Sequence, residues 1–142
     1  MKGSMWAHLY LSDIYIREKR YREATDLIQR AVQIAPDSYF AHVSLSLVYL
    51  KQARWNDSLK AIDKALSLHD KSGNPHYIRA SALARLGRKK EAMTALGTAI
   101  ELDAEILMFI ADDEDLKSLR TLPAFQKLLE QAKKQASETS PQ

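Results

Sequence analysis

The stretch that decides the fold runs from Tyr21 to Pro36 and reads YREATDLIQRAVQIAP. Its apolar and small residues recur at the three- and four-residue spacing of one helix face, with Ala24 and Ala31 seven residues apart, and Pro36 ends the helix. The same design returns 34 residues later and then once more, over the ranges 55–70 and 89–104. A supersecondary unit repeated at this period predicts a solenoid.

Each of these three helices follows another predicted helix. The preceding helices cover the ranges 5–18, 40–52 and 75–86. In the first of them, Leu11, Ile14 and Tyr15 form the clearest apolar stripe at helical spacing, so we expect this stripe to point inward. Gly87 closes the last of them in the place where helices favour glycine.

The pattern resembles the tetratricopeptide repeat from about Met5 to Ala104. Counting from Met5, Tyr39 and Gly73, the family's small residues at positions 8 and 20 correspond to Ser12 and Ala24, Ser46 and Ser58, and Ala80 and Ala92. The resemblance implies an all-α fold, a right-handed superhelical α-α solenoid of three helix pairs with C-terminal capping helices. Arg79 departs from the pattern, because the family has an apolar residue there.

This interpretation divides the chain into six parts. They are a tag or cut point at 1–4, repeats at 5–38, 39–72 and 73–104, a C-terminal helical cap at 105–135, and a disordered tail at 136–142. The cap is expected because the last repeat of a solenoid exposes an apolar side that needs covering. The chain is also open to interpretation as a fragment of a longer protein.

Composition excludes several classes of protein. The net charge of +3 and the pI of about 9.1 are too mildly basic to indicate nucleic-acid binding alone. The chain has no cysteine, which removes disulfides and thiolate metal sites. No apolar run reaches the roughly 18 residues that a membrane span needs. We expect a soluble protein, with a cytoplasmic location favoured.

The sequence offers no constellation for catalysis. His8, His42 and His76 recur at the fourth position of each repeat, but equivalent positions lie about 8–10 Å apart, too far to share one zinc ion. We interpret them as packing residues in a slot where the family has a large aromatic. With four glycines in the chain there is no phosphate-binding loop, and no nucleophile motif is present. We therefore expect no enzyme activity, no metal and no cofactor.

In this repeat family the first helix of each pair lines a concave wall. The resemblance therefore implies an apolar groove, rimmed by charge, that binds a peptide or helix of another protein. The candidate groove residues are Trp6, Leu9, Asp13, Ile16, Arg17, Phe40, Val43, Leu47, Leu50, Lys51, Tyr77, Ser81 and Arg85.

The groove does not match the members of the family that grip the C-terminal carboxylate of chaperones. Those members place lysine, asparagine and arginine at five defined positions of successive repeats. The corresponding residues here are Leu9, Asp13, Ser44, Asn74 and Ile78. None of them matches, so we expect a segment with aliphatic anchors as the ligand.

Three other interpretations stay open. The apolar wall could be buried in a homo-oligomer, or the chain could be the repeat module of a larger enzyme. Cations in the turns between paired helices could form a basic edge that binds RNA or an acidic protein, although they also complement the dipole of the first helix. The basic-edge residues are Arg20, Arg22, Arg54, Arg88, Lys89 and Lys90.

Overall fold

The computed structural model describes residues 3–139, which form helices joined by short turns. The chain forms two compact units, Met1–Asp70 (unit 1) and Lys71–Gln142 (unit 2). Unit 1 contains α1 (Met5–Arg17), α2 (Tyr21–Ile34), α3 (Tyr39–Lys51) and α4 (Trp55–Leu68). Unit 2 contains α5 (Gly73–Arg85), α6 (Lys89–Leu102), the 3-10 helices η1 (Ala104–Met108) and η2 (Glu114–Leu119), and α7 (Pro123–Thr139).

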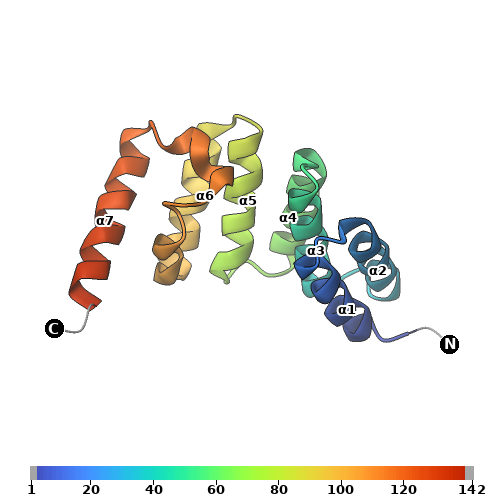
Figure 1. The fold of residues 1–142 in the computed structure, drawn as a ribbon. Helices are drawn as coiled ribbons and strands as arrows, with labels where there is room; N and C mark the ends of the chain where they lie inside the picture. Colours follow the sequence, from blue (N-terminus) through green and yellow to red (C-terminus); the bar gives the residue numbers. More distant parts are fainter. Residues whose placement is uncertain (1–2, 140–142) are drawn as a thin grey trace. The chain divides into compact units, whose positions relative to one another are not determined.

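The helices α1 to α6 associate as consecutive pairs, α1 with α2, α3 with α4 and α5 with α6 (Figure 1). This confirms the predicted all-α solenoid built from helix pairs. Across the described residues, no helix is long and apolar enough to cross a membrane.

The small residues at positions 8 and 20 of each repeat allow the paired helices to approach closely. In the second pair, the hydroxyl of Ser46 donates to the carbonyl oxygen of Ser58 at 2.8 Å, and the hydroxyl of Ser58 donates to the carbonyl oxygen of Ser46 at 2.9 Å. Both side chains are fully buried, so these bonds satisfy hydroxyls that would otherwise destabilise the core. The other two pairs use alanine or serine at the same places, and these residues are also buried.

The turn inside each pair has one conformation repeated three times. Its middle residue has a positive φ of 62° at Lys19, 60° at Ala53 and 78° at Gly87. This left-handed region favours glycine, so only the third turn has the residue that the backbone prefers.

The interface between the first two repeats is formed by α2 and α3. Ile28 and Ala31 of α2 and Val48 of α3 are fully buried there, and Leu45 packs against them. The prediction that Leu11 and Ile14 point inward is wrong, because both are exposed. They occupy the repeat positions of Leu45 and Val48, and within residues 3–139 no helix pair packs on those positions of the first repeat.

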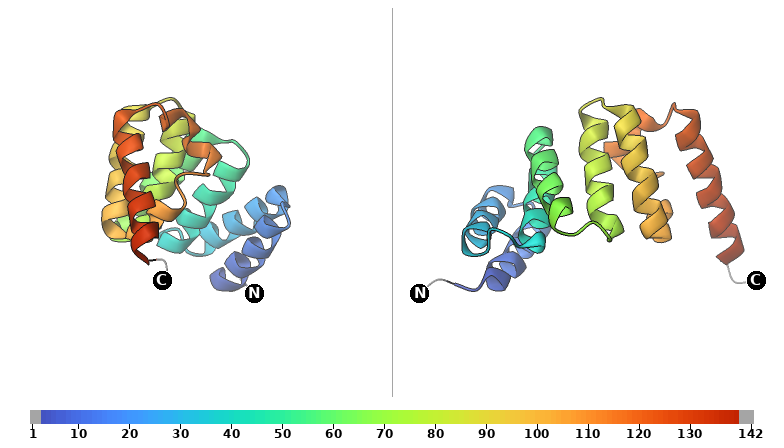
Figure 2. Two further views of the ribbon diagram at one scale, coloured as in Figure 1. Left: turned by 60° about the vertical axis from the view of Figure 1, so that its left-hand side comes forward. Right: turned by 180° about the vertical axis from the view of Figure 1, so that it is seen from behind.

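The segment after α6 closes unit 2. Leu116 and Leu119 of η2 and Phe125 of α7 are fully buried, and η2 contacts α5. The shorter helix η1 lies against both α6 and α7 (Figure 2). These contacts are those of the predicted cap.

Two predicted boundaries of the chain differ from the structure. The helix α7 continues to Thr139, so residues 136–139 of the expected disordered tail are helical; residues 140–142 lie outside the described residues. At the other end, Ser4 of the expected tag caps α1, because its hydroxyl accepts from the backbone N–H of Ala7 at 3.4 Å. Residues 1 and 2 lie outside the described residues.

Candidate interaction surface

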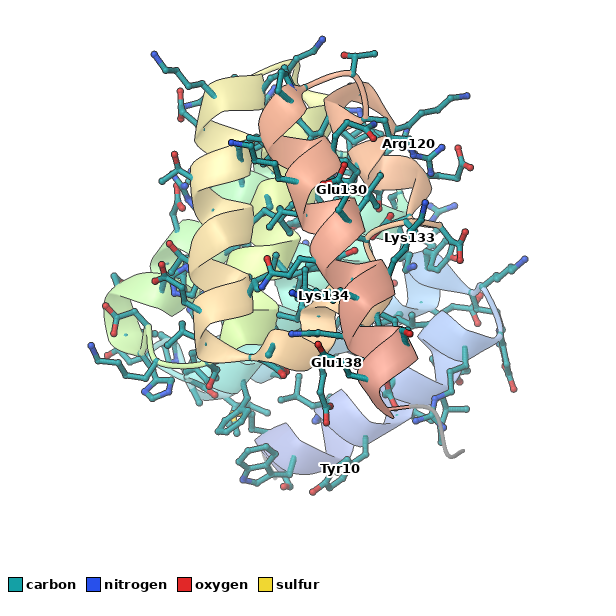
Figure 3. All side chains as sticks on the ribbon, turned by 90° about the vertical axis from the view of Figure 1, so that its left-hand side faces the viewer. Tyr10, Arg120, Glu130, Lys133, Lys134 and Glu138 are labelled. Carbon is teal, nitrogen blue, oxygen red and sulfur yellow. The ribbon has the colours of Figure 1, made fainter. Side chains whose placement is uncertain are left out.

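The first helices of unit 1, α1 and α3, contact each other and present an aromatic cluster. The ring centroids of Trp6 and Phe40 are 5.1 Å apart, and those of Trp6 and Tyr10 are 6.3 Å apart. The three residues are 44%, 54% and 69% exposed in the order Trp6, Phe40, Tyr10, which is unusual for side chains that gain so much from burial. Figure 3 labels Tyr10 on α1. Clustered, exposed aromatics are typical of binding sites.

We name this side of the two helices the α1–α3 surface. Besides the aromatic cluster Trp6, Tyr10 and Phe40, it comprises aliphatic and charged residues, namely Val43, Leu47, Asp13, Arg17 and Lys51. Val43 and Leu47 are partly buried and leave part of their side chains accessible. Asp13 pairs with Arg17 at 2.7 Å between carboxylate and guanidinium. Lys51 is exposed and, within residues 3–139, forms no ion pair.

Not every predicted groove residue lies at the surface. Leu9 and Leu50 are buried, and Ile16 is partly buried against the core of the first repeat. These three support the fold, and the accessible part of the α1–α3 surface is therefore narrower than the sequence pattern predicts. Tyr10 was not among the predicted residues, although its place one turn after Trp6 is a signal that could have identified it.

In unit 2, the predicted groove residues Tyr77 and Arg85 contact the chain's own η2 and its cap residue Asp113. The hydroxyl of Tyr77 donates to the carboxylate of Asp113, and the guanidinium of Arg85 donates to Asp115 at 2.7 Å. Ser118 donates to the carbonyl oxygen of Ala84 at 3.2 Å. Burial of the ring, together with the Asp113 carboxylate, raises the pKa of Tyr77 well above its usual range.

The third predicted groove residue of unit 2, Ser81, is buried and donates to the carbonyl oxygen of Tyr77 at 3.1 Å. Asp113 and Asp115 were not among the residues predicted to contact another helix. The available signal was the acidic run Asp112–Asp115 followed by leucines at 116 and 119, a spacing that places both leucines on one side of a short helix.

The arginines of the predicted basic edge are largely paired within their own repeats. Arg20, Arg54 and Arg88 immediately precede the second helices and form ion pairs with Glu23, Asp57 and Glu91, each three residues later. The guanidinium groups of Arg20 and Arg54 also lie 4.3 Å from the ring centroids of Tyr15 and Tyr49, respectively. These contacts order the turns and offset much of the positive charge. Arg22, Lys89 and Lys90 are exposed.

The histidines lie at separate places. His42 is buried and its Nε2 is 2.7 Å from the carbonyl oxygen of Pro36, while Nδ1 of His8 is 2.8 Å from the carbonyl oxygen of Ser4. Among residues 3–139, no group of three or more potential metal ligands is close enough to hold an ion.

Comparison with solved structures gives tetratricopeptide-repeat domains at low sequence identity. The first TPR of Spaghetti (RPAP3), bound to the HSP90 peptide SRMEEVD, is 15% identical with a TM-score of 0.71, covering 91% of this chain and 96% of that chain. The Arabidopsis OM64 TPR domain is 15% identical with a TM-score of 0.70, covering 84% and 93%. MamA MSR-1 is 22% identical with a TM-score of 0.72, covering 94% and 79%. At these identities the likeness shows the fold.

A comparison with curated protein sequences finds no match. A family model described as "Anaphase-promoting complex, cyclosome, subunit 3" matches residues 17–99, which is more than half of the chain. This match and the helix pairs described above agree. The chain belongs to the tetratricopeptide-repeat family, in the group of sequences that this family model describes.

Proposed function

We propose that this protein is a non-catalytic scaffold whose α1–α3 surface binds a short helical segment of another protein. The family and its structural neighbours support an interaction scaffold, and the RPAP3 domain is an example with a bound peptide. The kind of segment is inferred from this chain itself.

The observation that carries the proposal is the contact of η2 with α5. Position 5 of the third repeat is Tyr77, which binds Asp113, the N-cap residue of η2. Position 13 is Arg85, which binds Asp115 of η2. The two leucines of η2 are buried. The first helix of a repeat in this chain thus binds a short acidic segment with leucines three residues apart, through the positions that the resemblance assigns to a groove.

The α1–α3 surface repeats the basic residue of this contact and exposes apolar side chains. Position 13 is basic in all three repeats, as Arg17, Lys51 and Arg85. Lys51 could pair with an acidic residue of the bound segment in the way that Arg85 pairs with Asp115. Leu47 and Phe40 supply accessible apolar area for leucine side chains, each worth about 1.5–3 kcal/mol when fully buried.

The carboxylate-clamp function stays outside this proposal. The positions that would hold a chain-end carboxylate include Leu9, which is buried, and Asp13, which would repel the anion. We also do not favour the basic edge as an RNA site, since three of its arginines are held by carboxylates of their own repeats.

The test uses a labelled peptide with the chain's own sequence ADDEDLKSLRT, residues 111–121. Fluorescence anisotropy with the full chain should show saturable binding. The variants Phe40→Asp and Leu47→Asp should weaken binding at least tenfold, because each places a carboxylate in the apolar contact. A peptide of the same composition in scrambled order should bind at least tenfold more weakly.

The matched control is Phe109→Asp, which changes another exposed phenylalanine, in unit 2, and should leave peptide binding unchanged. Circular dichroism of each variant checks that the helices are retained. Equal binding by the Phe40→Asp variant, or by the scrambled peptide, would contradict the proposed surface.

A further inference from the structure

The outer side of α1 carries the residues that α3 uses to pack against the preceding repeat. Positions 3, 4, 7, 10 and 11 of the two repeats match closely. They are Ala7, His8, Leu11, Ile14 and Tyr15 in α1, which we name the stacking face, and Ala41, His42, Leu45, Val48 and Tyr49 in α3. In α3, the members Ala41, Leu45, Val48 and Tyr49 pack in one cluster with buried residues of α2, and Val48 is 0% exposed. In α1, Leu11 is 40% and Ile14 is 49% exposed.

A second apolar surface opens in unit 2. A cleft of about 530 Å³ lies between η1 and the C-terminal half of α7. Met108 and Phe109 on its wall are 55% and 65% exposed. The residues that line this C-terminal cleft are Ala104, Glu105, Met108, Phe109, Gln135 and Glu138.

The charges at the two surfaces are complementary. Beside the stacking face, Arg30 lines a hollow of about 300 Å³ together with His8 and Gln33. At the C-terminal cleft the charged lining residues are Glu105 and Glu138. Among residues 3–139, neither Arg30 nor either glutamate forms an ion pair. Figure 3 labels Glu138 near the end of α7, with Lys134 one turn before it.

We propose that the stacking face of one copy binds the C-terminal cleft of a second copy. Leu11 and Ile14 enter the cleft against Met108 and Phe109, and Arg30 pairs with the glutamates at its rim. The occupant is a second copy because a single chain carries both surfaces, each apolar at its centre and opposite in charge at its rim. The contact is heterologous, so each bound pair keeps one free stacking face and one free cleft.

Sedimentation velocity over a range of concentrations tests this with the full chain. The wild type should self-associate, and Ile14→Glu and Phe109→Glu should each weaken the association at least tenfold. Phe40→Glu is the matched control, since Phe40 is 54% exposed and lies in the α1–α3 surface; it should leave the association unchanged. Thermal unfolding followed by circular dichroism verifies that each variant is folded.

Mixing separates a heterologous contact from a symmetric one. The Ile14→Glu variant has a disrupted stacking face but an intact cleft, and the Phe109→Glu variant has the reverse. In an equimolar mixture, the intact face of one variant should therefore bind the intact cleft of the other, giving a one-to-one dimer that does not grow further. The charge reversals Arg30→Glu and Glu138→Arg should each weaken association, and mixing these two variants should restore part of it.

A wild type that stays monomeric at millimolar concentration would overturn the proposal. So would unchanged association of Phe109→Glu, which would indicate a symmetric contact between two stacking faces. Either result leaves the peptide experiment with the α1–α3 surface unaffected, because that experiment depends on Phe40 and Leu47.

Discussion

Unit 2 covers the first helix of its repeat with its own chain, whereas unit 1 leaves the equivalent surface open. In unit 2, η2 lies on α5, its leucines are buried, its cap residue Asp113 binds Tyr77 and its Asp115 binds Arg85. In unit 1, Trp6, Phe40 and Tyr10 remain exposed. A repeat position therefore does not determine its own role: the same place is core where a later segment returns to it and exposed surface where none does.

The largest expected effect comes from removing the cover in unit 2. Leu116→Ala should lower the free energy of unfolding of unit 2 by about 3 kcal/mol, because Leu116 is fully buried and the substitution leaves a cavity. Leu47→Ala in unit 1 should cost less than about 1.5 kcal/mol, since Leu47 already keeps part of its surface in water. Urea unfolding followed by circular dichroism measures both, and equal losses would contradict the distinction between covered and open surfaces.

A smaller effect depends on pH and on the contact of Tyr77 with Asp113. Burial and the carboxylate raise the pKa of Tyr77, so the folded state keeps the phenol protonated while the unfolded state loses the proton near pH 10. The stabilisation from this group is therefore fully present below pH 10 and is lost as the pH rises, by up to about 1.4 kcal/mol per pH unit.

The Tyr77→Phe variant isolates this contribution from the other tyrosines. At pH 8 the variant should be less stable than the wild type by about 1 kcal/mol through the lost hydrogen bond. Between pH 10 and pH 11 the difference should shrink. Urea unfolding at a series of pH values provides the comparison, and parallel profiles for the two proteins would show that Tyr77 is not held protonated by η2.

The smallest expected effects compare the turns within the helix pairs. Gly87→Ala should destabilise unit 2 by about 1 kcal/mol, because φ at this position is 78° and a residue with a Cβ is strained there. The loss is not due to a steric clash, since the added methyl group meets no atom within 4 Å. Ala53→Gly should stabilise unit 1 by about 0.5 to 1 kcal/mol for the same reason, since φ is 60°. Thermal unfolding should show opposite shifts of Tm; shifts of equal sign would refute the backbone explanation.

The sequence was sufficient to predict the helix pairs, because their information is local. The spacing of apolar residues, the small residues at positions 8 and 20 and the period of 34 residues recur without any need for distant contacts. The same local character explains the wrong inward assignment of Leu11 and Ile14. Their pattern matches that of Leu45 and Val48, and periodicity does not reveal whether a neighbouring helix is present.

The return of η2 to α5 could not be predicted in the same way. It joins Arg85 to Asp115, 30 residues later in the chain and outside the repeat, and no period relates the two. Capping of the last repeat was an expectation from the apolar residues of that segment, but which of them would bind α5 depended on three-dimensional packing. The candidate surface therefore stays a prediction as a binding site, and its sequence pattern was imprecise about which side chains are accessible, since Leu9, Leu50 and Ser81 are buried.

The covalent attachment of η2 reduces the number of sites that a free peptide can bind. A segment of the same chain competes at an effective concentration on the order of millimolar. A free peptide of the same sequence at micromolar concentration should therefore leave α5 occupied by η2 and bind the proposed α1–α3 surface instead. Because η2 already occupies the site on α5, titration should give one peptide bound per protein molecule.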